Sequence, residues 1–317
     1  MTRVICGVDV SSTSLEAFVG PAGPGRCFAN TAEGIVGLAA FCRENRVELV
    51  ALEASGGYEK QAFALLWSQK IAVALLNPRA VRDFARSMGL LEKTDGIDAR
   101  IIGRYAEVKG SAPSVPLSAQ QEHLKALVTH LRQLTQMHVS QRNQGLLVTD
   151  KTVRRSMAKL LKVLVAQKRE VAGKIAAVLG SDPLWKQMDQ AFRSIKGVAD
   201  RTVSVVAAEM PEIGMLSNKA AAKLGGLAPL AQDSGKKHGK RPVRGGRRQL
   251  RAILFVVAGV VARHNPDFAA FQQRLSAAGK PKKVIRVALA HKLLVRLNAK
   301  AREVRMQFMS VDAPQIA

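Results

Sequence analysis

The chain has 317 residues, 47% of them hydrophobic, which excludes a disordered tail and is enough for two or more domains with buried cores. Its 49 lysines and arginines outnumber 24 acidic residues and give a formal net charge of +25, so a polyanionic partner is expected. Three cysteines without C-x-x-C spacing predict neither a disulfide framework nor a zinc site and fit a reducing cytosol, and the longest apolar run, 252–262, is too short to cross a membrane.

Residues 1–112 predict an α/β domain. Apolar and β-branched runs predict strands, and helical spacing predicts the helices between them. The predicted strands are 3–10, 14–20, 26–30, 47–55 and 71–77, and the predicted helices are 31–45, 58–69, one that starts at Pro78 and one that carries KTDGIDAR at 93–100. The order βββαβαβα favours a mixed sheet that helices cover on both faces.

Residues 113–183 predict a long helical, coiled-coil-like segment. Pro113 and Pro116 end the first unit, and two long helices follow at 118–148 and 151–179. Apolar residues with a 3-4-3 spacing give each helix a stripe that is typical of a coiled coil or a helical hairpin. This stripe can pack on its own chain or form the seam of a dimer, and the sequence leaves both open.

Residues 184–317 predict a compact, mostly helical domain that is interrupted by a Gly-, Lys- and Arg-rich stretch at 233–248. The net charge is +1 over residues 1–111, +8 over 112–200 and +16 over 201–317. Neutralising phosphates releases counterions and drives strong, salt-dependent binding. The C-terminal two thirds are therefore expected to bind nucleic acid.

Four acidic residues stand where the predicted fold brings them together. Asp9 ends the first strand and Glu53 ends the fourth, and in a ribonuclease-H-like order these strands are parallel neighbours at the centre of the sheet. Asp95 and Asp98 share one face of a helix, because they are three residues apart. Converging carboxylates repel each other unless divalent cations neutralise them, and oxygen ligands favour Mg²⁺ or Mn²⁺. The pattern predicts a metal site suited to phosphodiester chemistry.

The same acids have a simpler structural explanation. Asp95 and Asp98 also favour a helix N-terminus with Thr94 as its cap, and each acid alone is more often such a residue. The four together, in this order, favour the metal site. Lys93 and Arg100, which flank the two aspartates, fit a phosphate backbone that runs past the metal.

Two features of the C-terminal part fit phosphate binding. Residues 194–214 predict a helix-hairpin-helix with Lys196 and Gly197 in its turn, although a plain helical hairpin is the alternative. The Gly-rich stretch concentrates basic side chains suited to an RNA or DNA backbone. These are Lys236, Lys237, Lys240, Arg241, Arg244, Arg247, Arg248 and Arg251.

Several of these segments together resemble a known family. GVDVS (7–11), LEASGGYE (52–59), NPRAVRDFA (77–85) and KTDGIDAR resemble the DEDD transposases of the insertion sequence 110 family. These are bridge-RNA-guided recombinases whose N-terminal domain is similar to the Holliday-junction resolvase RuvC. The resemblance implies a RuvC-like nuclease domain at 1–112, a helical segment at 113–183 and a C-terminal transposase domain at 184–317.

Ser234 gains a role only through this resemblance. By itself it is one serine in a glycine-rich loop. The segment GLAPLAQDSGKK (226–237) resembles the family's second catalytic motif, which implies that Ser234 is the nucleophile. The segment 279–294, with Lys282 and Lys283, resembles the family's final basic helix, which implies a further nucleic-acid contact.

The resemblance implies a recombinase that cuts and rejoins donor and target DNA through a phosphoserine intermediate, with Mg²⁺ assistance and a structured bridge RNA as guide. It also implies a homo-oligomer, a dimer or a tetramer built as a dimer of dimers, in which acids and serine come from different protomers. The implied location is the bacterial cytoplasm, at the nucleoid and away from membranes. An aromatic content of 4% fits sequence choice by base pairing rather than by extensive stacking.

Two alternatives from other classes stay open on the residues alone. One is a metal-dependent nuclease of resolvase type, in which water attacks and Ser234 is a bystander. The other is a non-catalytic protein that packages RNA or DNA. A covalent protein–DNA adduct separates the recombinase from the nuclease, and loss of activity in Asp9→Ala separates both from the packaging protein.

Overall fold

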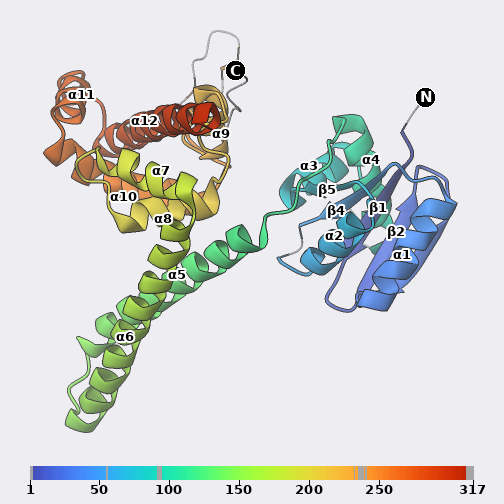
Figure 1. The fold of residues 1–317 in the computed structure, drawn as a ribbon, viewed down its shortest axis with the longest axis horizontal. Coiled ribbons are helices and arrows are strands. Elements are labelled where there is room, and N and C mark those ends of the chain that lie inside the picture. Colours follow the sequence, from blue (N-terminus) through green and yellow to red (C-terminus); the bar gives the residue numbers. More distant parts are fainter. Residues whose placement is uncertain are drawn as a thin grey trace. The chain divides into compact units, whose positions relative to one another are not determined.

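The computed structural model describes residues 3–54, 56–90, 95–231, 233–234, 239 and 241–311, with only the backbone of 95–97, 309 and 311. It divides into two compact units, Met1–Leu117 and Ser118–Ala317, called here the N-terminal and the C-terminal unit (Figure 1). The division of the chain at residues 112 and 183 stays a prediction.

A five-stranded mixed sheet forms the centre of the N-terminal unit, in the order β3-β2-β1-β4-β5. Its strands are β1 (Ile5–Val10), β2 (Ser14–Val19), β3 (Gly25–Ala29), β4 (Leu49–Glu53) and β5 (Val73–Leu76). β1, β2 and β3 pair antiparallel, whereas β1–β4 and β4–β5 pair parallel. This confirms the predicted ribonuclease-H-like sheet, with β1 and β4 as parallel neighbours near its centre.

Helices cover both faces of this sheet. The helices are α1 (Ala32–Glu44), α2 (Glu59–Ser68), α3 (Pro78–Ser87) and α4 (Asp95–Lys109). Successive residues of a strand point to opposite faces. Cys6 and Val8 pack in one apolar cluster with side chains of α1 and α2, whereas Ile5, Leu49 and Ala51 pack in another with side chains of α3 and α4. Gly7 and Asp9 of β1 therefore face α3 and α4.

Helix α4 crosses β1 in a backbone-to-backbone contact at Gly7. A Cβ on Gly7 would lie 2.0 Å from the carbonyl oxygen of Ala99 and 2.4 Å from the nitrogen of Gly103, so only glycine fits. The Arg3 guanidinium donates to the carbonyl oxygen of Ser111, which follows the end of α4. Helix α4 thus runs antiparallel to β1, and its N-terminal end lies toward the carboxyl end of that strand.

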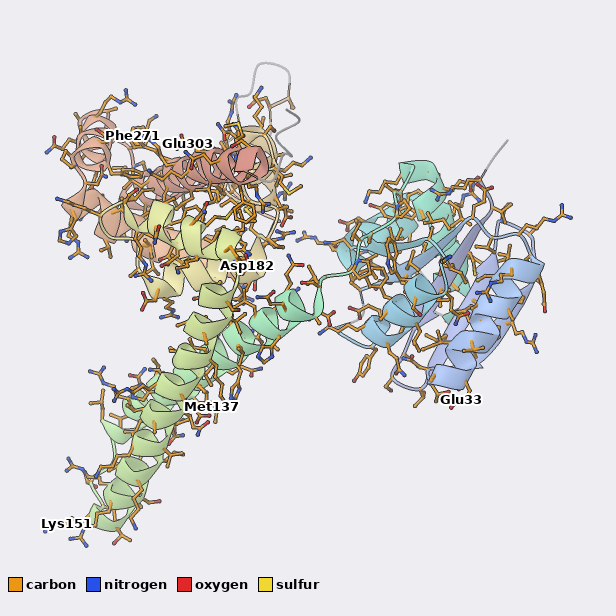
Figure 2. All side chains as sticks on the ribbon, viewed as in Figure 1. Glu33, Met137, Lys151, Asp182, Phe271 and Glu303 are labelled. Carbon is orange, nitrogen blue, oxygen red and sulfur yellow. The ribbon has the colours of Figure 1, made fainter. Side chains whose placement is uncertain are left out.

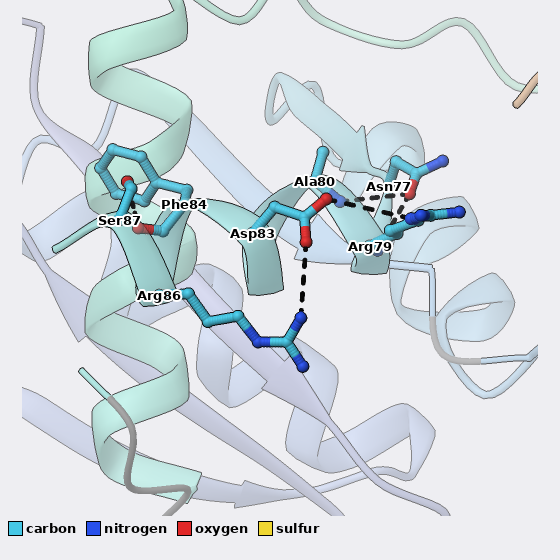
Figure 3. A network of polar contacts seen from close by, with 7 residues as sticks. All are labelled: Asn77, Arg79, Ala80, Asp83, Phe84, Arg86 and Ser87. Atoms are coloured by element: carbon cyan, nitrogen blue, oxygen red, sulfur yellow. Dashed lines mark hydrogen bonds and ion pairs between the residues drawn. The ribbon is translucent and has the colours of Figure 1, made fainter. Parts of the chain in front are cut away.

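Helix α3 has a polar, exposed face with a small ion-pair network (Figure 3). The Asn77 side chain caps its start by accepting the backbone N–H groups of Arg79 and Ala80. Asp83 pairs with Arg79 at 3.9 Å and with Arg86 at 3.7 Å. All three charged side chains are more than half exposed, so each pair adds only about 0–1 kcal/mol to the free energy of unfolding.

The C-terminal unit is helical. Its elements are α5 (Ala119–Gly145), α6 (Lys151–Ser181), α7 (Pro183–Arg193), α8 (Asp200–Glu209), α9 (Asn218–Leu224), α10 (Arg248–His264), α11 (Pro266–Ala277) and α12 (Lys282–Val311). Ser118 starts α5 with a capping box and Asp150 caps α6, which confirms both predicted long helices. Within the described residues, no helix combines the length and apolar character that a membrane span requires.

Helices α5 and α6 form a hairpin whose two ends differ. Near the bundle of α7 to α12, buried side chains such as Leu124 and Ile175 join one core with Met188 and Phe192 of α7. This end packs on its own chain. The other end reaches away from the bundle, with Lys151 at its tip (Figure 2). There the hairpin exposes apolar side chains, namely Met137, Leu146, Leu147, Val153, Leu160, Val163 and Val165.

We expect Gly7→Ala to lower the free energy of unfolding of the N-terminal unit by about 1–3 kcal/mol, because the methyl group forces α4 away from β1. Chemical denaturation monitored by circular dichroism measures this loss. Gly173→Ala in α6 is the control, since a Cβ there meets nothing within 4 Å and alanine favours a helix. Equal stability of Gly7→Ala and the wild type would show that α4 can move away from β1 without loss of stability.

Candidate active site

Asp9 and Glu53 lie on the same face and at the same edge of the sheet. The parallel register pairs Gly7 with Ala51 and Val8 with Leu52, so Asp9 and Glu53 occupy the next position on neighbouring strands. Glu53 pairs with Leu76 of β5, which belongs to the cluster under α3 and α4. Both acids are partly exposed. The predicted juxtaposition of these two residues thus follows from the register.

Helix α4 brings the other two acids toward this edge. Asp95 is its first residue and Asp98 is partly exposed in its first turn, immediately before Ala99, which touches Gly7. The N-terminal end of a helix carries positive partial charge, which stabilises carboxylates placed there. The side chain of Asp95 lies outside the described residues. Among the described side chains, no three His, Cys, Asp or Glu are grouped so that they could hold a metal ion.

Glu16 of β2 is an acid at this edge that the sequence analysis missed. It stands directly opposite Asp9 in the antiparallel register, so both side chains leave the same face of the sheet. Like charges directly opposite each other on a sheet are unfavourable. The signal was available, because a turn over residues 11–14 between two strands fixes this pairing.

Asn30 is a second residue that the sequence analysis missed. Its side-chain amide donates to the carbonyl oxygen of Ser11 at 2.8 Å and to that of Tyr58 at 3.3 Å. Ser11 follows β1 and Tyr58 lies in the loop after β4. Asn30 therefore ties together the two loops that follow the strands carrying Asp9 and Glu53. No local sequence pattern announces this contact, because it joins segments that are distant along the chain.

Of the two basic residues predicted to flank the aspartates, the structure describes only Arg100. Lys93 lies outside the described residues. Arg100 is exposed, and its guanidinium lies 3.9 Å from the centroid of the Phe18 ring on β2. Phe18 pairs with Gly7, so this contact lies on the face that carries Asp9. A stacked guanidinium keeps N–H groups at its edge for an anion.

Ser234 is exposed and follows a two-stranded ribbon, whose described pairs join residues 229–230 to residues 242–243. Pro229 and Val243 form an antiparallel bridge, and the Leu230 N–H donates to the carbonyl oxygen of Pro242. At its base, Gly226 and Gly246 approach so closely that a Cβ on Gly246 would lie 2.3 Å from the nitrogen of Gly226.

Three arginines of the basic stretch are engaged within the protein. Arg241 pairs with Asp233 at 3.0 Å, and Arg247 pairs with Glu212. Arg251 donates to the carbonyl oxygen of Gly245. Arg244 and Arg248 are exposed. Lys236, Lys237 and Lys240 lie outside the described residues.

Residues 194–214, predicted as a helix-hairpin-helix, contain a turn at Gly197 and a single helix, α8, because α7 already ends at Arg193. Gly197 has φ +100°, and a Cβ there would lie 3.0 Å from the backbone of Val261 in α10, so packing as well as the turn demands glycine. Arg193 of α7 donates to Asp189 and also pairs with Asp200 at the start of α8. These contacts raise the pKa of Arg193 above its usual value and brace the turn.

The turn between α7 and α8 carries an exposed positive charge, and a cavity lies between the neighbouring helices. Lys196 is exposed next to Gly197, and Ala199 gives α8 no side-chain cap. A cavity of about 470 Å³ opens between α5, α6, α7 and α8, with Lys186 and Arg201 among its lining residues. Lys282 and Lys283, at the start of α12, are exposed as well.

Comparison with known proteins shows which family the chain belongs to. Residues 6–172, more than half of the chain, match the model of the IS110 DEDD transposases, and residues 189–273 match that of the IS116/IS110/IS902 transposase family. The chain belongs to the IS110 family of DEDD transposases. The resemblance seen in the sequence is thereby confirmed, and the transposase is an enzyme that recombines DNA.

Individual relatives agree. The transposase is 26% identical over 311 residues to the pilin gene-inverting protein of Moraxella lacunata, which covers 93% of this chain and 94% of that protein, and the Moraxella bovis protein gives the same figures. It is 31% identical over 127 residues to the uncharacterized 43.6 kDa protein of insertion element IS110 from Streptomyces coelicolor, or 39% and 30% of the two chains. T. thermophilus RuvC, solved in complex with a Holliday junction substrate, is similar with 16% identity and a TM-score of 0.29, over 35% of the transposase and 99% of RuvC.

We expect Arg244→Gln with Arg248→Gln to reduce the log–log salt slope of duplex DNA binding by about 2, since each lost phosphate contact removes about 0.9. Fluorescence anisotropy over a salt series measures the slope. Arg26→Gln with Arg43→Gln, two exposed arginines of the N-terminal unit, changes the charge equally and should leave the slope unchanged. An equal change of the salt slope in both double variants would show that the slope depends on the total charge of the protein and not on Arg244 and Arg248.

Proposed function

We propose that this transposase cuts and rejoins DNA through a covalent bond to Ser234, with a divalent metal ion held by Asp9, Glu53, Asp95 and Asp98. The observation that carries the metal site is the register of β1 and β4, which puts two acids side by side under the N-terminal end of α4. All four candidate ligands offer carboxylate oxygens, the donors that Mg²⁺ and Mn²⁺ prefer. The donor set therefore fits Mg²⁺, with Mn²⁺ as a substitute.

The chemistry divides between the acids and the serine. A bound Mg²⁺ would stabilise negative charge on the attacking and leaving oxygens. The Ser234 Oγ attacks the phosphorus of a DNA strand: an Oγ–P bond forms, the bond from phosphorus to the leaving sugar oxygen breaks, and the hydroxyl proton ends on that oxygen by way of solvent. Rejoining is the reverse step with the hydroxyl of another strand, which releases the serine. No oxidant or further reactant is needed.

The basic surfaces fit nucleic-acid backbones in this scheme. Arg244 and Arg248 beside the ribbon, Lys196 at the turn and Lys282 and Lys283 at the start of α12 are exposed and positive. We propose that they hold donor and target DNA together with a structured guide RNA, at the bacterial nucleoid. Base pairing to the guide would choose the sites, since the protein has few aromatic side chains for reading bases.

The exposed distal part of the α5–α6 hairpin fits contact with a second copy of the transposase. Its apolar side chains include Leu146 and Leu147, which are 78% and 87% exposed. Exposed apolar clusters of this kind mark interaction surfaces. We propose a homo-oligomer, a dimer or a dimer of dimers, in which the acids of one chain can serve the serine of another.

A second candidate function is a metal-dependent nuclease without a serine nucleophile. It is favoured by the placement of Asp9 and Glu53, which the sheet fixes independently of the ribbon. In this mechanism water attacks, strands are cut and not rejoined, and no adduct forms. Direct tests of the acids, the serine and the guide RNA separate it from the leading proposal.

Asp9→Ala and Glu53→Ala should each lower strand cleavage by at least about 1,000-fold, since each removes a charged ligand from the metal. EDTA should silence the wild type, and Mg²⁺ should restore it. Cleavage of a plasmid that carries the transposase gene with its flanking DNA measures the rate, and unchanged melting shows that the fold is retained. Asp83→Ala, an exposed acid on α3, is the control. Strand cleavage at the wild-type rate in both Asp9→Ala and Glu53→Ala would contradict the proposed metal site.

Ser234→Ala should bind DNA normally but form no adduct and rejoin no strands. The wild type, stopped with SDS, should carry DNA on the peptide that contains Ser234, as mass spectrometry can show. Mixing Asp9→Ala chains with Ser234→Ala chains should return part of the activity if chains complement each other. Normal cleavage by Ser234→Ala, or an adduct on another residue, would leave the nuclease as the better account.

A structured non-coding RNA should co-purify with the transposase from cells that carry the whole element. Sequencing of the bound RNA measures this, and the expected product is one discrete RNA with stretches complementary to the joined DNA sites. Ribonuclease treatment should then abolish recombination while leaving the protein folded. Full recombination by RNA-free protein would contradict RNA guidance and leave the acid and serine proposals untouched.

A further inference from the structure

Ser234 follows the only acidic residue between positions 230 and 260, Asp233. An acid within a phosphate-binding stretch repels the DNA backbone, so its position calls for another explanation. The Asp233 carboxylate is bound on both oxygens: Oδ2 pairs with the guanidinium of Arg241 at 3.0 Å, and Oδ1 accepts the backbone N–H of Gly239 at 3.2 Å. These contacts join the two strands of the ribbon immediately beside the serine.

The register of the ribbon explains these partners. Pro229 lies opposite Val243, and Leu230 bonds to Pro242. Asp233 is four residues after Pro229 and Gly239 is four residues before Val243, and the Asp233 side chain accepts the Gly239 N–H. The side chain thus supplies a cross-strand bond at the last position before Ser234.

We propose that Asp233 is a positioning residue that, through Arg241 and Gly239, fixes the backbone of Ser234 and so the direction of its hydroxyl. The inference rests on the proposed function, in which Ser234 is the nucleophile. The pair is largely at the surface, with side-chain exposures of 60% for Arg241 and 30% for Asp233, so it adds little to overall stability. Its effect is local, and a nucleophile displaced by about 1 Å loses roughly 100-fold in rate.

The test uses the full-length transposase with a plasmid that carries its gene and flanking DNA. Asp233→Ala should slow formation of the Ser234 adduct by about 10- to 100-fold. DNA affinity should stay equal or rise, because an acid has been removed. If Asp233 acted only by repelling the DNA backbone, Asp233→Ala would form the adduct faster than the wild type. Asp233→Asn keeps an oxygen for the Gly239 N–H, so its adduct rate should lie between those of the wild type and Asp233→Ala.

Matched variants separate positioning from charge. Arg241→Asp and Asp233→Arg should each form the adduct slowly, and the double variant, which restores the ion pair in reverse, should recover part of the rate. Arg26→Gln, which removes an exposed positive charge from the N-terminal unit, is the control and should leave both DNA affinity and the adduct rate unchanged.

Two results overturn the inference in different ways. An adduct rate equal to the wild type in Asp233→Ala, or a loss that follows DNA affinity alone, removes Asp233 from the mechanism and leaves the proposed function standing. Absence of any adduct on Ser234 in the wild type overturns the proposed function and this inference with it. Thermal melting of each variant shows whether the fold persists, and the reversed pair keeps the test decisive if one single variant melts early.

Discussion

The backbone contact between β1 and α4 is the constraint on which the N-terminal unit depends. Because Gly7 has no side chain, the turn from Ala99 to Gly103 rests directly on the strand. A helix that close to the sheet, and antiparallel to β1, begins at the edge where β1 and β4 end. The acids proposed as metal ligands, which come from β1, β4 and α4, are thereby brought toward one edge. A bulkier residue at Gly7 would move half of the proposed metal site without touching any of its ligands.

The basic side chains of the C-terminal unit fall into two groups: some bind other groups of the protein, and others are exposed to solvent. Arg247 and Arg251 secure the base of the ribbon, Arg193 braces the turn before α8, and Lys292 of α12 lies against the rings of Phe268 and Phe271, where burial lowers its pKa. A high net charge thus serves two purposes. Some cations hold carbonyl oxygens and acids of the protein, and the exposed remainder offers charge to phosphates.

Much of this organisation could be predicted from the sequence. Strand periodicity and turn residues predicted the sheet, and acids at the ends of two strands predicted Asp9 and Glu53, since the carboxyl ends of parallel neighbouring strands meet at one edge of a sheet. Glu16 was missed although the short turn over residues 11–14 fixes its pairing with Asp9, whereas Asn30 was missed because its contacts join loops that are distant along the chain. The protein partners of Arg241 and Arg247 were missed because a run of basic residues does not reveal which of them are already paired.

The proposed mechanism requires a divalent metal ion at the edge of the sheet under α4. Anomalous X-ray diffraction from crystals of the transposase soaked in Mn²⁺ tests it without reference to activity. We expect an anomalous peak at about 2.0–2.2 Å from carboxylate oxygens of Asp9 and Glu53, with Asp98 close by. A fully occupied Mn²⁺ site elsewhere on the protein, with none at this edge, would contradict it.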